Sequence, residues 1–135
     1  MDRRTHPPQQ PAGPAPAEVA ALAEALNDID NLERDAFGDA VNAAIVRNVK
    51  SATLSGSSVS IRGLARVLGL EPSTIRRRIA RLIDAGWVER DAEDRLRYSR
   101  EGLERGRELT RVALERFARM FRAIGWGNVA PPGPE

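Results

Sequence analysis

Hydroxyl and guanidinium groups gather between Glu71 and Leu82, where they could bind phosphates and base edges. The polar members of this stretch are Ser73, Thr74, Arg76, Arg77, Arg78 and Arg81. A hydroxyl beside the free N–H groups of a helix start can hold a phosphate, and an arginine can donate two hydrogen bonds to guanine O6 and N7. The chemistry on offer is therefore the binding of a polyanion.

A helix over Pro72–Ala85 would separate these groups from an apolar stripe. At about 100° per residue, Ile79 and Leu82 lie within about 40° of Ile75. The opposite face carries Ser73, Thr74, Arg77 and Arg81, with Arg76 and Arg78 on its two sides. We expect base contacts from Ser73, Thr74, Arg76 and Arg77, and a phosphate contact from Arg81. A run of arginines can equally be a solvated helix face. The position of the run in the fold therefore has to distinguish a DNA-binding surface from such a face.

The segment before this helix has the features of a short helix and a tight turn. Ser60–Gly69 predicts a helix that Ser60 caps and that Gly69 ends. Pro72 suits the first position of the next helix, because the N–H that proline lacks would have no partner there. A short helix, a turn with glycine and a longer helix form the helix-turn-helix pattern.

A β-hairpin is predicted after the second of these helices. Trp87–Arg90 and Arg95–Tyr98 indicate two short strands around the polar tip Asp91–Asp94. This hairpin would be a wing beside the helix-turn-helix. We expect Trp87 to pack beneath the wing rather than to stack on bases. The acids of the tip could form a metal or catalytic pair, but a solvated turn is the favoured interpretation.

Two helices are predicted before the helix-turn-helix. Ala17–Asp30 and Arg34–Lys50 both carry apolar residues at spacings of three and four, which place them on one stripe. A kink or break is expected at Asn31–Glu33, and Ser51–Ser58 is expected to be a loop because it is rich in serine and glycine.

A long helix is predicted after the hairpin, over Arg100–Ile124, with Ser99 as its cap and Gly125 at its end. Its apolar face is wider than one small domain needs. Broad apolar faces at both ends of the chain favour burial against a second subunit. The alternative is that the terminal helices pack only on each other.

The length of 135 residues and the apolar content of 41% suit one small domain. The net charge of +2 says little, but its distribution is uneven. Residues 60–100 hold ten arginines against six acidic residues, whereas residues 1–59 hold five basic and eight acidic ones. This asymmetry favours a nucleic-acid partner. Arginine abundance alone is weak evidence, because only Lys50 among the basic residues is lysine and base composition can produce such a bias.

Several classes of protein are excluded by what the sequence lacks. Without cysteine there is no disulfide and no cysteine-ligated zinc. His6, the only histidine, lies in the proline-rich stretch Met1–Pro16, which is expected to be disordered. We find no catalytic set, no metal-ligand spacing and no cofactor motif, so the chain is not expected to be an enzyme. It has no apolar run near the ~18 residues of a membrane span, so a cytoplasmic protein is expected.

Residues 59–102 resemble the winged helix-turn-helix of bacterial transcription regulators, most closely that of the multiple-antibiotic-resistance-regulator (MarR) family. The matching stretches are Val59–Ala65, Gly69–Ile75, Leu82–Arg90, the wing tip Asp91–Arg95 and Ser99–Gly102. The resemblance implies a dimer interface built from the helices at both ends of the chain. It also implies DNA contacts from Ser73, Thr74, Arg76 and Arg77, and a minor-groove contact from Arg95. Arg62, in the first stretch, is counted with the DNA-binding residues.

Two features depart from the family pattern. The returning wing strand, Arg95–Tyr98, is shorter than usual, which argues against deep insertion into the minor groove. Glu71 stands at the helix cap in place of Ser, Thr or Asp. Its charge suits the helix dipole but would repel a phosphate, so we expect its side chain to point aside.

Taken together, these patterns predict a mainly α fold with a small β-hairpin wing. The expected parts are tails at 1–16 and 126–135, N-terminal helices at 17–50, a winged helix-turn-helix at 51–99 and a C-terminal dimerisation helix at 100–125. The expected function is sequence-specific binding of double-stranded DNA by a homodimeric transcription regulator at a pseudo-palindromic site. The alternative is a winged-helix protein-interaction module with little intrinsic affinity for DNA. A small-molecule effector between the DNA-binding lobe and the dimer helices is left open.

Overall fold

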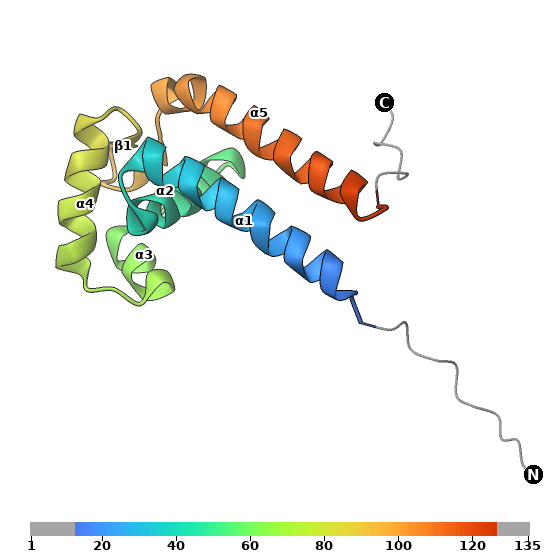
Figure 1. The fold of residues 1–135 in the computed structure, drawn as a ribbon. Helices are drawn as coiled ribbons and strands as arrows, with labels where there is room; N and C mark the ends of the chain where they lie inside the picture. The colour runs from blue at the N-terminus through green and yellow to red at the C-terminus, as the bar shows by residue number, and fades with distance from the viewer. Residues whose placement is uncertain (1–12, 127–135) are drawn as a thin grey trace, which may run out of the picture.

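The structure, a computed structural model, describes residues 13–126. Within this range five helices and a two-stranded hairpin follow one another along the chain (Figure 1). Their bounds are Pro16–Phe37 for α1, Ala40–Leu54 for α2, Ile61–Leu68 for α3, Pro72–Asp84 for α4, Val88–Arg90 for β1, Leu96–Tyr98 for β2 and Arg100–Ala123 for α5. The predicted mainly α fold with a hairpin wing is confirmed. The tails predicted at 1–16 and 126–135 fall largely outside the described residues.

The predicted break at Asn31–Glu33 is wrong, because α1 continues through these residues to Phe37. Nothing in Asn31–Glu33 forces a helix to end. The break lies at Gly38, which has a φ of 108° that other residues rarely adopt. Asp39 then caps α2, since its Oδ1 accepts a hydrogen bond of 2.8 Å from the Asn42 backbone N–H.

The loop predicted at Ser51–Ser58 begins later than expected, because α2 continues to Leu54. The Oγ1 of Thr53 donates to the Val49 carbonyl at 2.9 Å, four residues back along the helix. Such a bond satisfies the hydroxyl without leaving the helix, which explains why this polar stretch stays helical.

The helix-turn-helix forms as predicted. Ser60 caps α3 by accepting a 2.9 Å hydrogen bond from the Gly63 N–H. Gly69 ends α3 in the left-handed conformation, with a φ of 67°. Pro72 opens α4 at the position where its missing N–H costs nothing.

The wing is a short antiparallel hairpin in which Val88 lies opposite Tyr98 and Arg90 lies opposite Leu96. Val59 forms an isolated bridge to the free edge of β2, also at Leu96. The sequence did not predict this third pairing, because a single residue is too short to show a strand pattern. It fixes the base of the wing to the segment that leads into α3.

The core lies between α2, α4 and the wing. Ile45, Ile75, Ile79 and Leu96 are fully buried and join these elements. Burying each such side chain stabilises the fold by about 1.5–3 kcal/mol. Trp87 is also buried, with its ring centroid 4.9 Å from that of Phe37, so the packing interpretation of this residue is confirmed.

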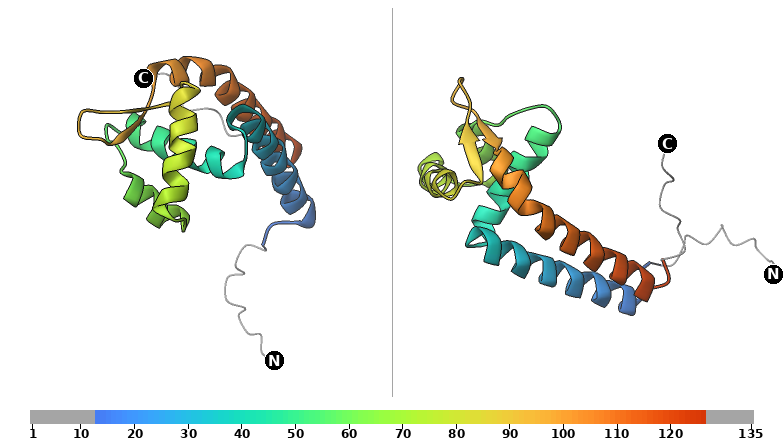
Figure 2. Two further views of the ribbon diagram at one scale, coloured as in Figure 1. Left: turned by 90° about the vertical axis from the view of Figure 1, so that its left-hand side faces the viewer. Right: turned by 90° about the horizontal axis from the view of Figure 1, so that it is seen from above.

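α1 and α5 run side by side in opposite directions and project away from the rest of the chain (Figure 2). Two polar contacts join them. Arg116 Nε lies 2.6 Å from Asp28 Oδ2, and Trp126 Nε1 donates to Glu18 Oε2 at 2.9 Å. We call this pair of helices the arm, and residues 40–99 the winged-helix lobe. No helix in the described range is both long enough and apolar enough to cross a membrane.

Candidate nucleic-acid interface

α4 presents the polar face that its sequence predicts. Ile75, Ile79 and Leu82 are buried against the core, which fixes the rotation of the helix. The opposite side faces outward, along the outer edge of the winged-helix lobe and away from the tip of the arm (Figure 1). The exposed residues on this side include Ser73, Arg76, Arg77, Ala80 and Arg81, and Thr74 is half-buried. The structure therefore brings the predicted contacts of this helix to one surface.

The guanidinium groups on this surface have no anionic partner within the part of the chain that the structure describes. Among residues 13–126, no ion pair or side-chain hydrogen bond involves Arg62, Arg76, Arg77 or Arg81. On α5, by contrast, most arginines lie beside a carboxylate, as Arg107 does beside Glu104 and Arg111 beside Glu108. Positive charge on α3 and α4 is thus free to meet an external polyanion.

The first turn of α4 adds a second kind of donor. Glu71 occupies the cap position but makes no capping hydrogen bond with its side chain, which is exposed. Ser73 is exposed in this turn. The first backbone hydrogen bond of the helix is the one that the Thr74 N–H donates to the Glu71 carbonyl at 3.0 Å, so the N–H of Ser73 lies before the hydrogen-bonded part of the helix. An N–H and a hydroxyl at a helix start suit a phosphate oxygen or a base edge.

Arg78 differs from its neighbours in the arginine run. Its Nη1 lies 2.8 Å from Asp39 Oδ1, 2.6 Å from Asp39 Oδ2 and 3.0 Å from Asn42 Oδ1. Hydrogen bonds from Arg78, and then from the Asn42 backbone, hold the pKa of Asp39 below its ordinary value. The sequence analysis missed this pair. The local signal Gly38-Asp39, a helix break followed by a cap, could have indicated that a carboxylate lies at a corner of the fold, but not which residue it pairs with.

The wing places Arg95 at its base. The Nε of Arg95 donates to Ser58 Oγ and its Nη2 to the Ser58 carbonyl, each at 2.7 Å. A contact between Arg95 and a minor groove would require these bonds to break, so that contact stays a prediction. At the tip, Asp91 accepts hydrogen bonds from the backbone N–H groups of Arg95 and Glu93, which lower its pKa. Its carboxylate therefore builds the turn.

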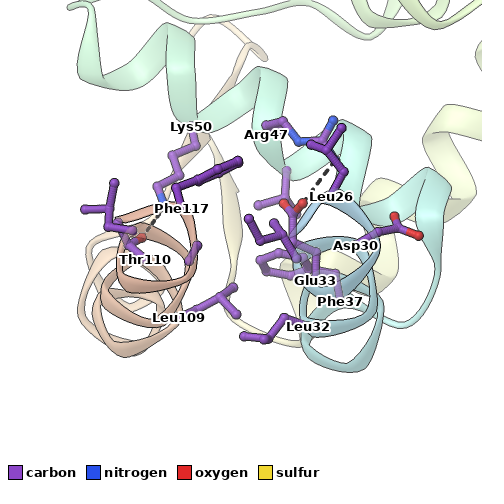
Figure 3. A pocket seen from close by; sticks show the side chains of 14 residues that line it. Leu26, Asp30, Leu32, Glu33, Phe37, Arg47, Lys50, Leu109, Thr110 and Phe117 are labelled. Carbon is purple, nitrogen blue, oxygen red and sulfur yellow. Dashed lines mark hydrogen bonds and ion pairs between the residues drawn. The ribbon is translucent and has the colours of Figure 1, made fainter. Parts of the chain in front are cut away.

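A cavity of about 580 Å³ lies where the arm meets the lobe (Figure 3). Its wall is largely apolar and comes from α1, α2 and α5, with Leu26, Ile29, Phe37, Leu109, Leu114 and Phe117 among its residues. Lys50 is one of the few polar groups there, and its Nζ donates to Thr110 Oγ1 at 3.1 Å. The cavity has the size and character of a small-molecule site.

Comparison with known proteins identifies one family. The model of the MarR family matches residues 51–95, which cover the end of α2, all of α3, α4 and β1, and the wing turn. No curated protein matches the chain. The resemblance seen in the sequence is thus confirmed for the lobe, which is a MarR-like winged helix of the kind found in transcription regulators. The matched residues include no part of α1 or α5.

Proposed function

We propose that this protein is a transcription regulator that binds a pseudo-palindromic site in double-stranded DNA as a homodimer. The observation that carries the proposal is the outer face of α4. Ser73, Arg76, Arg77 and Arg81 are exposed together there, on the second helix of a helix-turn-helix and beside a wing. A helix in this position enters the major groove, where base edges differ for every base pair. Such a regulator acts in the cytoplasm of a bacterial cell.

The roles of the residues follow from their places on the lobe. Ser73, Thr74, Arg76 and Arg77 lie in the first half of α4 and contact base edges. Arg81, one turn later, contacts a phosphate. Arg62 on α3 does the same, because the first helix of this motif crosses the DNA backbone. Arg95 reaches the minor groove once it leaves Ser58.

The exposed face of the arm supports a second copy of this chain as the partner. On α1, Val19, Leu22 and Leu26 are 55%, 44% and 50% exposed, at spacings of three and four. On α5, Leu114 and Phe121 are 64% and 41% exposed, seven residues apart. These spacings are typical of helices that pack against other helices.

Charge also favours pairing between two arms. α1 carries six acidic residues and one arginine, whereas α5 carries seven arginines and four glutamates. A second copy that places its α5 against α1 of the first therefore brings opposite charges together. By two-fold symmetry the same contact forms twice, which doubles its effect.

A small-molecule effector would have a site available in the cavity of about 580 Å³ between the arm and the winged-helix lobe. The family resemblance implies effectors in this region. The lining is largely apolar but also holds five polar residues, so a largely apolar molecule with more than one polar group fits it best. These residues are Asp30, Glu33, Arg47, Lys50 and Thr110.

Salt-dependent binding tests the proposal against its alternative. Fluorescence anisotropy with labelled genomic fragments should show saturable binding that weakens between about 50 mM and about 200 mM salt. Because Arg62 and Arg81 act in both subunits, four phosphates are neutralised, and the log–log slope should be about −3.6 or steeper. Arg81→Gln should reduce this slope by about 1.8, since the dimer then loses two contacts. Absence of saturable binding at low salt would favour the alternative, a protein-interaction module.

A further inference from the structure

Arg78 lies in the middle of α4 but belongs to a network on the side of the helix that faces the start of α2. Its guanidinium contacts both carboxylate oxygens of Asp39 and the side-chain oxygen of Asn42, at 2.6–3.0 Å. The Nδ2 of Asn42 in turn donates to the Phe37 carbonyl at 2.8 Å. The side chain of Arg78 is 29% exposed and that of Asp39 is 48% exposed. This network ties α4 to the corner between α1 and α2, which comprises Phe37, Gly38 and Asp39.

Apart from the buried packing of Ile75, Ile79 and Leu82, the other attachments of α4 are polar and hold its two ends. At the start, Leu70 and Glu71 form the tight turn from α3. At the end, Arg105 Nη1 of α5 donates to the Ala85 carbonyl at 2.5 Å, and the Trp87 N–H donates to the Leu82 carbonyl at 2.9 Å. Between these ends, the pair of Arg78 and Asp39 is the ion pair that holds α4 among the residues that the structure describes.

We propose that Arg78 and Asp39 are positioning residues for DNA recognition, and that their ion pair holds α4 at the rotation that presents Arg77 to a base. Arg78 itself does not contact the DNA. The inference rests on the proposed function, because it assigns a role in the same interface. A base contact needs its side chain held within about 0.5 Å and about 10–20° of the productive geometry. The burial of Ile75, Ile79 and Leu82 sets the rotation of α4 coarsely, and the ion pair at the middle of the helix restrains the smaller rotations that remain.

The same corner connects α4 to the arm. Phe37 is the last residue of α1, and its ring packs edge-on against Trp87 just after α4. A change in the direction of α1 would therefore reach α4 at two points, through Asp39 and through Trp87. The corner thus links the proposed dimer contact to the orientation of the helix that contacts DNA.

The variant Asp39→Asn separates positioning from simple electrostatics. Asparagine caps a helix as well as aspartate does, so α2 keeps its cap. The substitution removes a negative charge near the DNA-binding face, and charge alone would strengthen binding to DNA. Positioning predicts the opposite: about three- to tenfold weaker binding, the scale for residues in one salt-bridge network. Arg78→Gln should cause a similar loss, and the double variant should lose no more than either single one.

The salt dependence separates positioning from a phosphate contact. If Arg78 neutralised a phosphate in each subunit, Arg78→Gln would reduce the log–log slope by about 1.8. A positioning residue leaves the slope unchanged. The matched control is Glu104→Gln, which removes the 3.4 Å pair with Arg107 at an exposed position of α5 without touching α4. Its DNA affinity should stay within twofold, about the scatter of a surface substitution.

Hydrogen exchange in the free protein gives a readout that does not need DNA. Amides in α4 should exchange faster in Asp39→Asn and Arg78→Gln but not in Glu104→Gln, while amides in the middle of α2 stay protected and show that the variants fold. Unchanged exchange in α4, or DNA binding by Asp39→Asn equal to or tighter than wild type, would overturn the inference. If wild-type protein binds no DNA, the proposed function fails, and exchange alone then shows whether the pair holds α4.

Discussion

Replacing Leu22 by glutamate is expected to convert the dimer to a monomer and to lower the affinity for a two-half-site DNA by about 100-fold or more. Leu22 lies on the apolar face of the arm and is 44% exposed in the single chain. In a dimer a glutamate there would lose its hydration among apolar side chains, on a helix that is already acidic. Each lobe would then have to bind its half-site independently. Analytical ultracentrifugation measures the first effect and anisotropy the second.

The matched control for this variant is Leu54→Glu. Leu54 is 64% exposed, but it is the last residue of α2 and therefore lies off the arm. The substitution adds the same charge at an apolar surface position, so the oligomeric state should not change. A Leu22→Glu protein that remains dimeric, or that binds both half-sites as tightly as wild type, would show that the arm is not the dimer interface.

Arg77→Ala is expected to relax the base preference of the protein. Arg77 is exposed at the centre of the outer face of α4, without an acidic partner among the described residues. A bidentate pair of hydrogen bonds from arginine to guanine discriminates against other bases by about 1–3 kcal/mol. Binding to a set of duplexes with single base changes measures this loss, and the ranking of bases at one position in each half-site should flatten.

Arg81→Gln is the control, because it removes the same charge from the same helix one turn later. It should weaken binding to all duplexes by a similar factor and leave the ranking of bases unchanged. If Arg77→Ala instead keeps the wild-type ranking, the base contacts lie elsewhere on α4 and the assignment of its DNA-binding face is wrong.

The partners of the arginines, rather than their number, distinguish the face that we propose for DNA binding. The arginine run 76–78 looks uniform in the sequence. Within residues 13–126, however, only Arg78 has an acidic partner, which is Asp39, 39 residues earlier in the chain. Arg95 resembles a wing contact in the sequence, but two bonds hold it to Ser58. Such pairings form only when distant segments meet, so no local pattern could predict them.

Local signals were sufficient for the helix-turn-helix itself. Ser60, Gly69 and Pro72 each satisfy a physical requirement at a helix end, and each lies where the sequence placed it. The corner between α1 and α2 had equally local signals in Gly38 and Asp39. The apolar residues on either side obscured these signals. Their spacing of three and four residues continues across Gly38, so it fits one uninterrupted helix as well as two. The predictions therefore failed where periodicity was given more weight than a glycine followed by a cap.

Selection of bound fragments from genomic DNA tests the central claim most directly, that two copies of α4 contact two major grooves through one dimer. The wild-type protein should enrich fragments that share an inverted repeat, with half-site centres about 10–10.5 base pairs apart or a multiple of this. That spacing places the two copies of α4 on one side of the duplex. Enrichment of a single unrepeated motif would contradict the dimer, and no enrichment over input DNA would contradict sequence-specific binding by α4.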